Sequence, residues 1–303
     1  MKPLRLLRAA LLLFTPLSLL TPLSLHAAVS AAWTTPIAPF QIADNVYYVG
    51  SQDLAAYLIT TPSGNILINA NLDSSPALIR ASVQQLGFQW TDTRILLNGQ
   101  AHFDHMAGAA QILRETHARN MVMDSDAPVV ESGGRSDFAY NTDGIYTFPP
   151  SHVDRVLHNL DTVQLGGVTL TAHRTAGHTH GCTTWTLRAH MAGDPASTLR
   201  NIVIVGGFAP LSQYRLVDRP GQPASYPGIA TDFQHTYATL RALPCDVFLG
   251  AHGVYFNMLD KLSRLKTQGP SVWIDPTGYR TAIDQAQTNF NTTLQSQQTA
   301  KKL

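Results

Sequence analysis

The stretch "NGQAHFDHMAG" (residues 98–108) carries three potential metal ligands, His102, Asp104 and His105, within four residues. Histidine and carboxylate side chains are common zinc ligands in proteins. In an extended loop, the side chains of Gln100, His102 and Asp104 would point to the same side. An HxDH string alone is weak evidence for a metal site, because so short a motif also occurs by chance.

Two further histidines strengthen the case for a metal site. His178 lies in the glycine-flanked turn "TAGHTHG" (175–181), and His252 follows an apolar run in "FLGAHG" (248–253). Both are expected on loops at strand ends, where α/β proteins bind ligands. Five potential ligands on three loops, together with Gln100, therefore predict a site for one or two metal ions.

The segments around these loops alternate between strand and helix patterns, which predicts an α/β fold. Short apolar runs bounded by turn residues indicate strands, and apolar residues at helical spacing indicate helices. A long polar segment at 129–156 without a clear pattern is of the kind that is often functional. Strands are expected at 45–50, 55–70 (a hairpin), 93–99, 162–178 (a hairpin), 182–190, 201–207 and 246–253, and helices at 75–87, 105–119, 229–243 and 279–302.

Residues 1–32 have the pattern of a secretory signal peptide, in which a short basic stretch precedes an apolar segment and small residues. The apolar segment is interrupted and shorter than the roughly 20 residues of a membrane-spanning helix. We therefore expect one mature domain at 33–303, exported to a bacterial periplasm. The expected cleavage positions are Ala27, Ala28, Ala31 and Ala32.

The composition argues for a small substrate. The formal net charge is +1 and 14% of the residues are charged, so no basic face or acidic tail stands out. We expect a monomer that acts on a small molecule, with no nucleic-acid or membrane partner. Only Cys182 and Cys245 are present. Cys182 lies four residues after His178, whereas Cys245 lies seven residues before His252, at the far end of its predicted strand. Unless the two strands run in opposite senses relative to the site, the Cα atoms are farther apart than the roughly 7 Å that a disulfide allows, so we expect free thiols.

Several motifs together resemble a known superfamily. The "HFDH" string, the "GHTHG" turn and the late strand-end His252 are similar to the metallo-β-lactamase fold superfamily. This resemblance implies a four-layer αβ/βα sandwich with a zinc site at one edge between the layers. The segments that resemble its class B β-lactamases of the third subclass are "SGGRSDFAY" (132–140), "DGIYTFPP" (143–150), "AGHTHGCTTW" (176–185), "LPCDVFLGAHG" (243–253) and "IDPTGYR" (274–280).

The resemblance also implies how zinc would be held. The family usually has histidine at the position of Gln100, and a minority of the subclass shows the same replacement. An amide carbonyl is a weaker zinc ligand than imidazole, so the first zinc site should be the weaker one. The sequence leaves open whether Gln100 binds metal and whether one or two ions act. By position, the ligands are Gln100, His102 and His178 for the first zinc, and Asp104, His105 and His252 for the second.

The activity that the resemblance implies is zinc-dependent hydrolysis of the β-lactam ring amide of penicillins, cephalosporins and carbapenems by a metal-bound hydroxide, which gives antibiotic resistance. Asp104 is the implied catalytic residue, because its carboxylate can orient the water or relay its proton. Tyr140, Ser212 and Arg215 are candidates for contacts with the substrate.

Two alternatives stay open. One is a zinc hydrolase of the same fold that acts on another ester, lactone or thioester, and the other is a non-catalytic zinc-binding protein that lost its first site at Gln100. Glyoxalase II enzymes and lactonases of the superfamily carry a bridging Asp at the end of the strand after the GHTxG turn. Here that strand, in "NIVIVGGFAP" (201–210), ends in Gly206 and Gly207, which disfavours those relatives.

Overall fold

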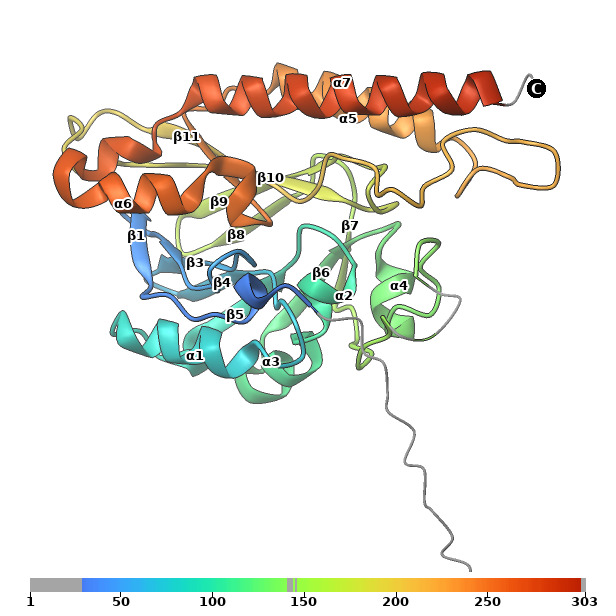
Figure 1. Ribbon diagram of the computed structural model, residues 1–303. Coiled ribbons are helices and arrows are strands. Elements are labelled where there is room, and N and C mark those ends of the chain that lie inside the picture. Colours follow the sequence, from blue (N-terminus) through green and yellow to red (C-terminus); the bar gives the residue numbers. More distant parts are fainter. Residues whose placement is uncertain (1–28, 141–143, 145, 301–303) are drawn as a thin grey trace, which may run out of the picture.

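The computed structural model describes residues 29–140, 144 and 146–300 (Figure 1). Most of the predicted signal peptide, residues 1–28, lies outside the described residues. Ala31–Trp33 form a short 3-10 helix, η1, at the start of the described chain. Within these ranges, no helix combines the length and the apolar character needed to cross a membrane.

The first half of the described chain forms a mixed sheet. Its strands pair in sequence order, antiparallel from β1 to β4 and parallel from β4 to β7. The parallel part places the carboxyl ends of β4, β5 and β6 at one edge, where α/β sheets bind ligands. The strands are β1 (Phe40–Ala43), β2 (Val46–Tyr48), β3 (Tyr57–Thr61), β4 (Gly64–Ile68), β5 (Thr93–Leu97), β6 (Arg119–Met123) and β7 (Arg155–Leu157).

The second half forms another sheet, in the order β12, β11, β10, β9, β8. Only β11 and β12 run parallel among these neighbours. Its strands are β8 (Thr162–Leu165), β9 (Val168–Arg174), β10 (Thr183–Ala189), β11 (Arg200–Val205) and β12 (Val247–Gly250).

The two sheets face each other and helices cover their outer faces, which gives four layers (Figure 1). Helices α1 (Pro76–Gln85) and α3 (Ala109–Thr116) lie on the first sheet, and α5 (Ile229–Ala242) and α7 (Pro276–Ala300) on the second. The predicted αβ/βα sandwich is therefore confirmed. The shorter helices are α2 (Phe103–Met106), α4 (Ala127–Ser132), α6 (Met258–Gln268), η2 (Trp90–Asp92), η3 (Gly253–Phe256) and η4 (Gly269–Trp273).

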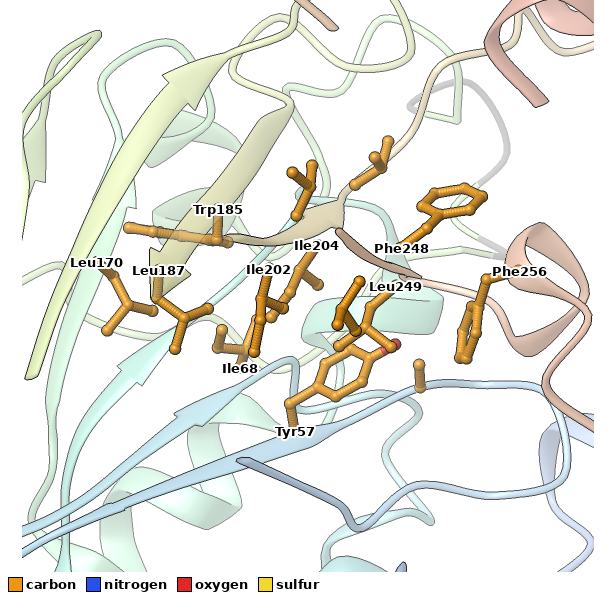
Figure 2. Close-up of a cluster of buried hydrophobic side chains, with 14 of the residues drawn as sticks. Tyr57, Ile68, Leu170, Trp185, Leu187, Ile202, Ile204, Phe248, Leu249 and Phe256 are labelled. Atoms are coloured by element: carbon orange, nitrogen blue, oxygen red, sulfur yellow. The ribbon is translucent and has the colours of Figure 1, made fainter. Parts of the chain in front are cut away.

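The main core lies between the sheets (Figure 2). Residues alternate along the strands: Tyr57 and Ile68 face the second sheet, whereas Leu58 and Leu67 belong to the separate cluster beneath α1 and α3. Each large apolar side chain buried in this way contributes about 1.5 to 3 kcal/mol. The core also reaches the ligand loop, because the buried Trp185 indole donates to the Asn98 carbonyl at 2.8 Å.

Most predicted elements are confirmed, including both hairpins, but the single helix expected at 105–119 is correct only in part. The chain forms α2 and α3 there, interrupted near Gly108, and β6 begins at Arg119. A Cβ at Gly108 would lie 2.4 Å from the Ala70 carbonyl oxygen, so this point is pressed against the end of β4. The long segment at 129–156 is also more regular than expected, since it begins in α4 and ends in β7.

Both cysteines are free, as predicted. Cys182 is buried next to the start of β10 and donates to the Gly207 carbonyl at 3.4 Å. Burial raises the pKa of its thiol, which keeps it protonated and unreactive.

Candidate metal centre

The loop after β5 is held by backbone contacts with neighbouring strands. Asn69, in the left-handed conformation, accepts a hydrogen bond from the Gly99 amide at 2.9 Å and donates to the Ala55 carbonyl at 3.0 Å. Gly99 lies directly against Gly206, since a Cβ on Gly99 would be 2.8 Å from the Gly206 Cα. The loop therefore leaves the sheet along one defined path and carries Gln100 into the interior.

Helix α2 then places the next ligand candidates. His102 is extended and precedes the helix, whereas Asp104 and His105 lie in its single turn and are buried. The expected alternation of Gln100, His102 and Asp104 in one extended loop is thus wrong for Asp104. The His105 carbonyl accepts from the Ala70 amide at 2.9 Å, which fixes the helix against the first sheet.

His178 comes from the turn between β9 and β10. Its Nδ1 lies 2.8 Å from the Ala209 carbonyl oxygen, and its own carbonyl accepts from the buried Tyr214 hydroxyl at 2.6 Å. Gly177 in this turn has φ of 129°, a conformation that favours glycine. These contacts fix both the backbone and the ring of His178. The role of Tyr214 has no local signal in the sequence.

His252 follows β12, and its ring lies among other aromatic rings and carboxylates. Its Nδ1 is 3.1 Å from Oδ2 of the buried Asp53, and its Nε2 is 3.5 Å from Oδ2 of Asp104. The indole ring of Trp33 lies 5.5 Å from the imidazole, centroid to centroid. The His252 ring thus joins the N-terminal segment to the Asp104 loop.

Asp104, His105 and His252, named here the second ligand set, form a compact cluster. Their ligand atoms lie within 4.8 Å of one another, and Asp104 Oδ2 is 3.3 Å from His105 Nε2. Burial opposes ionisation of Asp104, but the adjoining histidines hold its pKa well below the ordinary value. For His252, burial is likewise outweighed, because hydrogen bonds to Asp104 and Asp53 raise its pKa to about 9.

Gln100, His102 and His178, named here the first ligand set, are also buried. The rings of His102 and His178 lie 4.8 Å apart, and burial lowers the pKa of His178 to about 4 and that of His102 well below its ordinary value. The Gln100 amide nitrogen donates to the Gly206 carbonyl at 3.2 Å, whereas its oxygen has no hydrogen-bond partner among the described residues. This set is therefore neutral at pH 7.

The nitrogen and oxygen atoms of both ligand sets fit a bound metal ion. Buried polar atoms are normally hydrogen-bonded. Gln100 Oε1 and both ring nitrogens of His105 have no hydrogen-bond partner within the described part of the chain. Imidazole nitrogen and carboxylate oxygen are zinc ligands, and two histidines with one carboxylate suffice for a catalytic zinc site. The second ligand set offers that combination.

Two buried carboxylates behind the first ligand set were not anticipated from the sequence. Asp126 accepts from the Thr179 hydroxyl and the Gly181 amide, both at 2.7 Å, and burial raises its pKa to about 6. Asp137 Oδ2 lies 3.5 Å from His102 Nε2, and burial raises its pKa to about 7. Asp126 stabilises the turn that carries His178, whereas Asp137 faces His102 directly.

The three residues predicted to contact the substrate differ in their position and exposure. The Tyr140 ring lies edge-on to His102, with centroids 4.9 Å apart, and so borders the first ligand set. Ser212 is exposed, and Arg215 is exposed with its guanidinium donating to the Pro223 carbonyl of its own loop. The ring of His180 lies 3.8 Å from that of Tyr226, in an aromatic cluster outside both ligand sets.

The end of β11 has no space for a side chain. A Cβ on Gly206 would lie 2.1 Å from the Gly99 carbonyl oxygen, and a Cβ on Gly207 would lie 2.9 Å from the His178 ring. Contacts below 3.0 Å require the surroundings to move. A bridging carboxylate at this strand end is therefore excluded by packing as well as by sequence.

Comparisons with known proteins agree with this geometry. Residues 54–190 match the family model described as the metallo-β-lactamase superfamily. The native FEZ-1 metallo-β-lactamase from Legionella gormanii is 45% identical, with a TM-score of 0.83 over 88% of this chain and 98% of that one. The class B3 di-zinc enzyme LRA-12 from an Alaskan soil metagenome is 35% identical, with a TM-score of 0.80 over 88% and 97%.

A third solved structure points the same way. The subclass B3 enzyme BJP-1 of Bradyrhizobium japonicum is 34% identical, with a TM-score of 0.80 over 89% of this chain and 98% of that one. The shared fold, the ligand loops and the extent of these matches confirm the resemblance seen in the sequence. The chain belongs to the metallo-β-lactamase superfamily and, within it, to the subclass B3 enzymes.

Proposed function

We propose that the protein is a zinc-dependent β-lactamase that hydrolyses the ring amide of penicillins, cephalosporins and carbapenems in the periplasm and so gives antibiotic resistance. The observation that carries this proposal is the second ligand set, in which one carboxylate and two imidazoles lie within 4.8 Å. Its relatives are named as metallo-β-lactamases, and one is described as a di-zinc enzyme.

Zinc, when bound, would supply an activated water at neutral pH and a Lewis acid for the developing negative charge. We assign one zinc site to Asp104, His105 and His252, and a weaker one to the first ligand set. The Asp104 carboxylate remains ionised, because its pKa is held well below the ordinary value. It can therefore accept a hydrogen bond from the attacking water, orient it, and help relay its proton.

Aromatic side chains would shape the substrate pocket. Tyr140 lies against His102 and 6.2 Å from Phe103, centroid to centroid, and Trp33 lies 6.3 Å from Phe103. These rings border the ligand sets and would exclude water from the reacting carbonyl, which strengthens the electrostatic interactions there. Ser212 and Arg215 remain candidates for the substrate carboxylate only if their loop turns toward the site.

The alternative of a lactone or thioester hydrolase is disfavoured by the closed packing at Gly206 and Gly207. The non-catalytic alternative is disfavoured because the second ligand set is complete. Neither alternative is supported by a separate observation.

Hydrolysis of a carbapenem and of a penicillin by the purified protein, stripped of metal and then titrated with zinc, tests the proposal. We expect activity that appears with zinc, and saturation at one equivalent would show that the second ligand set is sufficient. Absence of hydrolysis at every zinc concentration, in a protein that binds zinc, would overturn it. The Asp104→Ala variant serves as the inactive control.

A further inference from the structure

Asp53 is a buried carboxylate that no sequence motif indicates, and three donors converge on it. His252 Nδ1 and Trp33 Nε1 each lie 3.1 Å from Oδ2, and the Val254 amide lies 3.0 Å from Oδ1. Buried carboxylates are costly unless they are paired and hydrogen-bonded. Asp53 meets this condition only because two segments far apart in the sequence, Trp33 in η1 and His252 with Val254 after β12, contribute donors.

The backbone of the same residue ties these segments together. The Gly253 amide donates to the Asp53 carbonyl at 2.7 Å, and the Asp53 amide donates to the Ala32 carbonyl at 3.0 Å. Leu54 and His252 also form an isolated antiparallel bridge. The loop after β12, the segment before β3 and the N-terminal η1 are therefore fixed at one point.

The hydrogen bond between Nδ1 and Asp53 also determines which nitrogen of His252 is available to a metal ion. A neutral imidazole that donates from Nδ1 has its lone pair on Nε2. Nε2 is the atom that lies 3.5 Å from Asp104 in the second ligand set. A carboxylate behind a metal-binding histidine fixes the ring orientation and increases its basicity, and its loss typically lowers metal affinity about 10- to 100-fold.

We infer that Asp53 is a positioning residue for the second ligand set, and that Trp33, through Asp53, makes the N-terminal segment part of the metal site. The inference rests on the proposed function only in that a metal binds at His252. Trp33 contributes its indole N–H to Asp53 and packs its ring against His252. Trp33 thereby restricts the orientation of both the Asp53 carboxylate and the His252 imidazole.

The test is the zinc affinity of Asp53→Asn and Trp33→Phe, measured without substrate by competition with a chromophoric chelator. Asparagine keeps the size of the side chain but removes the charge, so we expect Asp53→Asn to lower the affinity of the tighter site about 10- to 100-fold. Trp33→Phe keeps an aromatic ring, though a smaller one, and loses the indole N–H, so we expect a decrease of a few-fold.

Asp275→Asn is the matched control. Asp275 is also a partly buried carboxylate, which accepts from the Gly278 amide at 2.8 Å and pairs with the buried Lys261 at 2.9 Å. It neighbours Ile274, which bridges to Val247 at the start of β12, whereas His252 follows the end of that strand. We expect Asp275→Asn to lower the melting temperature of the metal-free protein and leave zinc affinity unchanged.

Wild-type zinc affinity in Asp53→Asn would overturn the inference, and so would equal losses of affinity in Asp53→Asn and Asp275→Asn, because these would indicate a general structural effect. A Co²⁺-loaded Asp53→Asn protein should also show a visible spectrum different from the wild type. If the wild type binds zinc tightly but hydrolyses no β-lactam, the proposed function fails while the effect of Asp53→Asn still decides the inference.

Discussion

The two ligand sets lie side by side but differ in charge and in support. The second set contains an ionised carboxylate, Asp104, and Asp53 lies behind one of its histidines at 3.1 Å. The first set replaces a histidine by the neutral Gln100, and the nitrogen of its His178 is held by a carbonyl. A divalent cation gains more from a carboxylate in a buried site than from neutral donors. The difference predicts unequal metal binding within a single centre.

The largest expected effect comes from removing the charged member. Asp104→Ala should lower kcat/KM by on the order of 10³-fold or more, because it removes a ligand and a preorganised charge at the reacting centre. The corresponding change in the first set, Gln100→Ala, should lower it by about tenfold or less, since an amide carbonyl is a weak zinc ligand. Steady-state β-lactam hydrolysis with excess zinc measures both. A larger loss in Gln100→Ala would reverse the proposed ranking.

The sets should also differ in how zinc affinity depends on pH. In the metal-free protein the pKa of His252 is raised to about 9, so below that pH zinc must displace a proton from this ring. Affinity of the second set should therefore rise about tenfold per pH unit, or about 100-fold from pH 6.5 to 8.5. The first set should show no such rise, because the pKa of His178 is lowered to about 4.

The same raised pKa has a consequence for the metal-free fold. A histidine whose folded pKa exceeds its unfolded value stabilises the fold fully below the unfolded pKa of about 6.5, and this contribution is lost as pH rises through about 9. Chelator competition and thermal unfolding of the metal-free protein, each from pH 6 to 9, measure the two effects. If the zinc affinity of the tighter site did not change with pH, the assignment of His252 to that site would be contradicted.

The elements that were predicted correctly are mostly those whose signal lies within a short stretch of neighbouring residues. Hairpins at β3–β4 and β8–β9 follow from apolar runs around turn residues, and the ligand loops follow from motifs at strand ends. The break between α2 and α3 was missed because it depends on the contact of Gly108 with Ala70, which lies far away in the sequence. Helix α6 and strands β1 and β6 were not predicted, although α6 carries leucines at helical spacing.

The metal site shows the same difference between local sequence patterns and long-range contacts. The ligand candidates could be identified from "HFDH", "GHTHG" and "GAHG", whereas the carboxylates that support them could not. Asp53 pairs with a histidine 199 positions away, and Asp126 with a threonine 53 positions away. Only the folded chain brings such partners together, so a single sequence has no spacing rule that would reveal them.

Strengthening the weaker set should reduce the difference between the two. Gln100→His would place an imidazole where the amide oxygen now lacks a partner, and we expect about a tenfold gain in affinity for the second equivalent of zinc. Gln100→Leu, of similar size but without a donor atom, is the matched control and should weaken that step. Equal affinities in Gln100→His, Gln100→Leu and the wild type would show that position 100 does not face the metal.

The smallest expected effect tests the carboxylate behind the first set. Asp137 lies 3.5 Å from His102, farther than the 3.1 Å between Asp53 and His252, and hydrogen bonds weaken at such distances. Asp137→Asn should therefore lower first-set zinc affinity only a few-fold, below the 10- to 100-fold range of about 1.4 to 2.7 kcal/mol expected for a well-aligned carboxylate. A two-step zinc titration separates the sets. If Asp137→Asn weakens zinc binding as much as Asp53→Asn does, the two histidines are equally supported and the inequality must come from the ligands themselves, Asp104 in one set and Gln100 in the other.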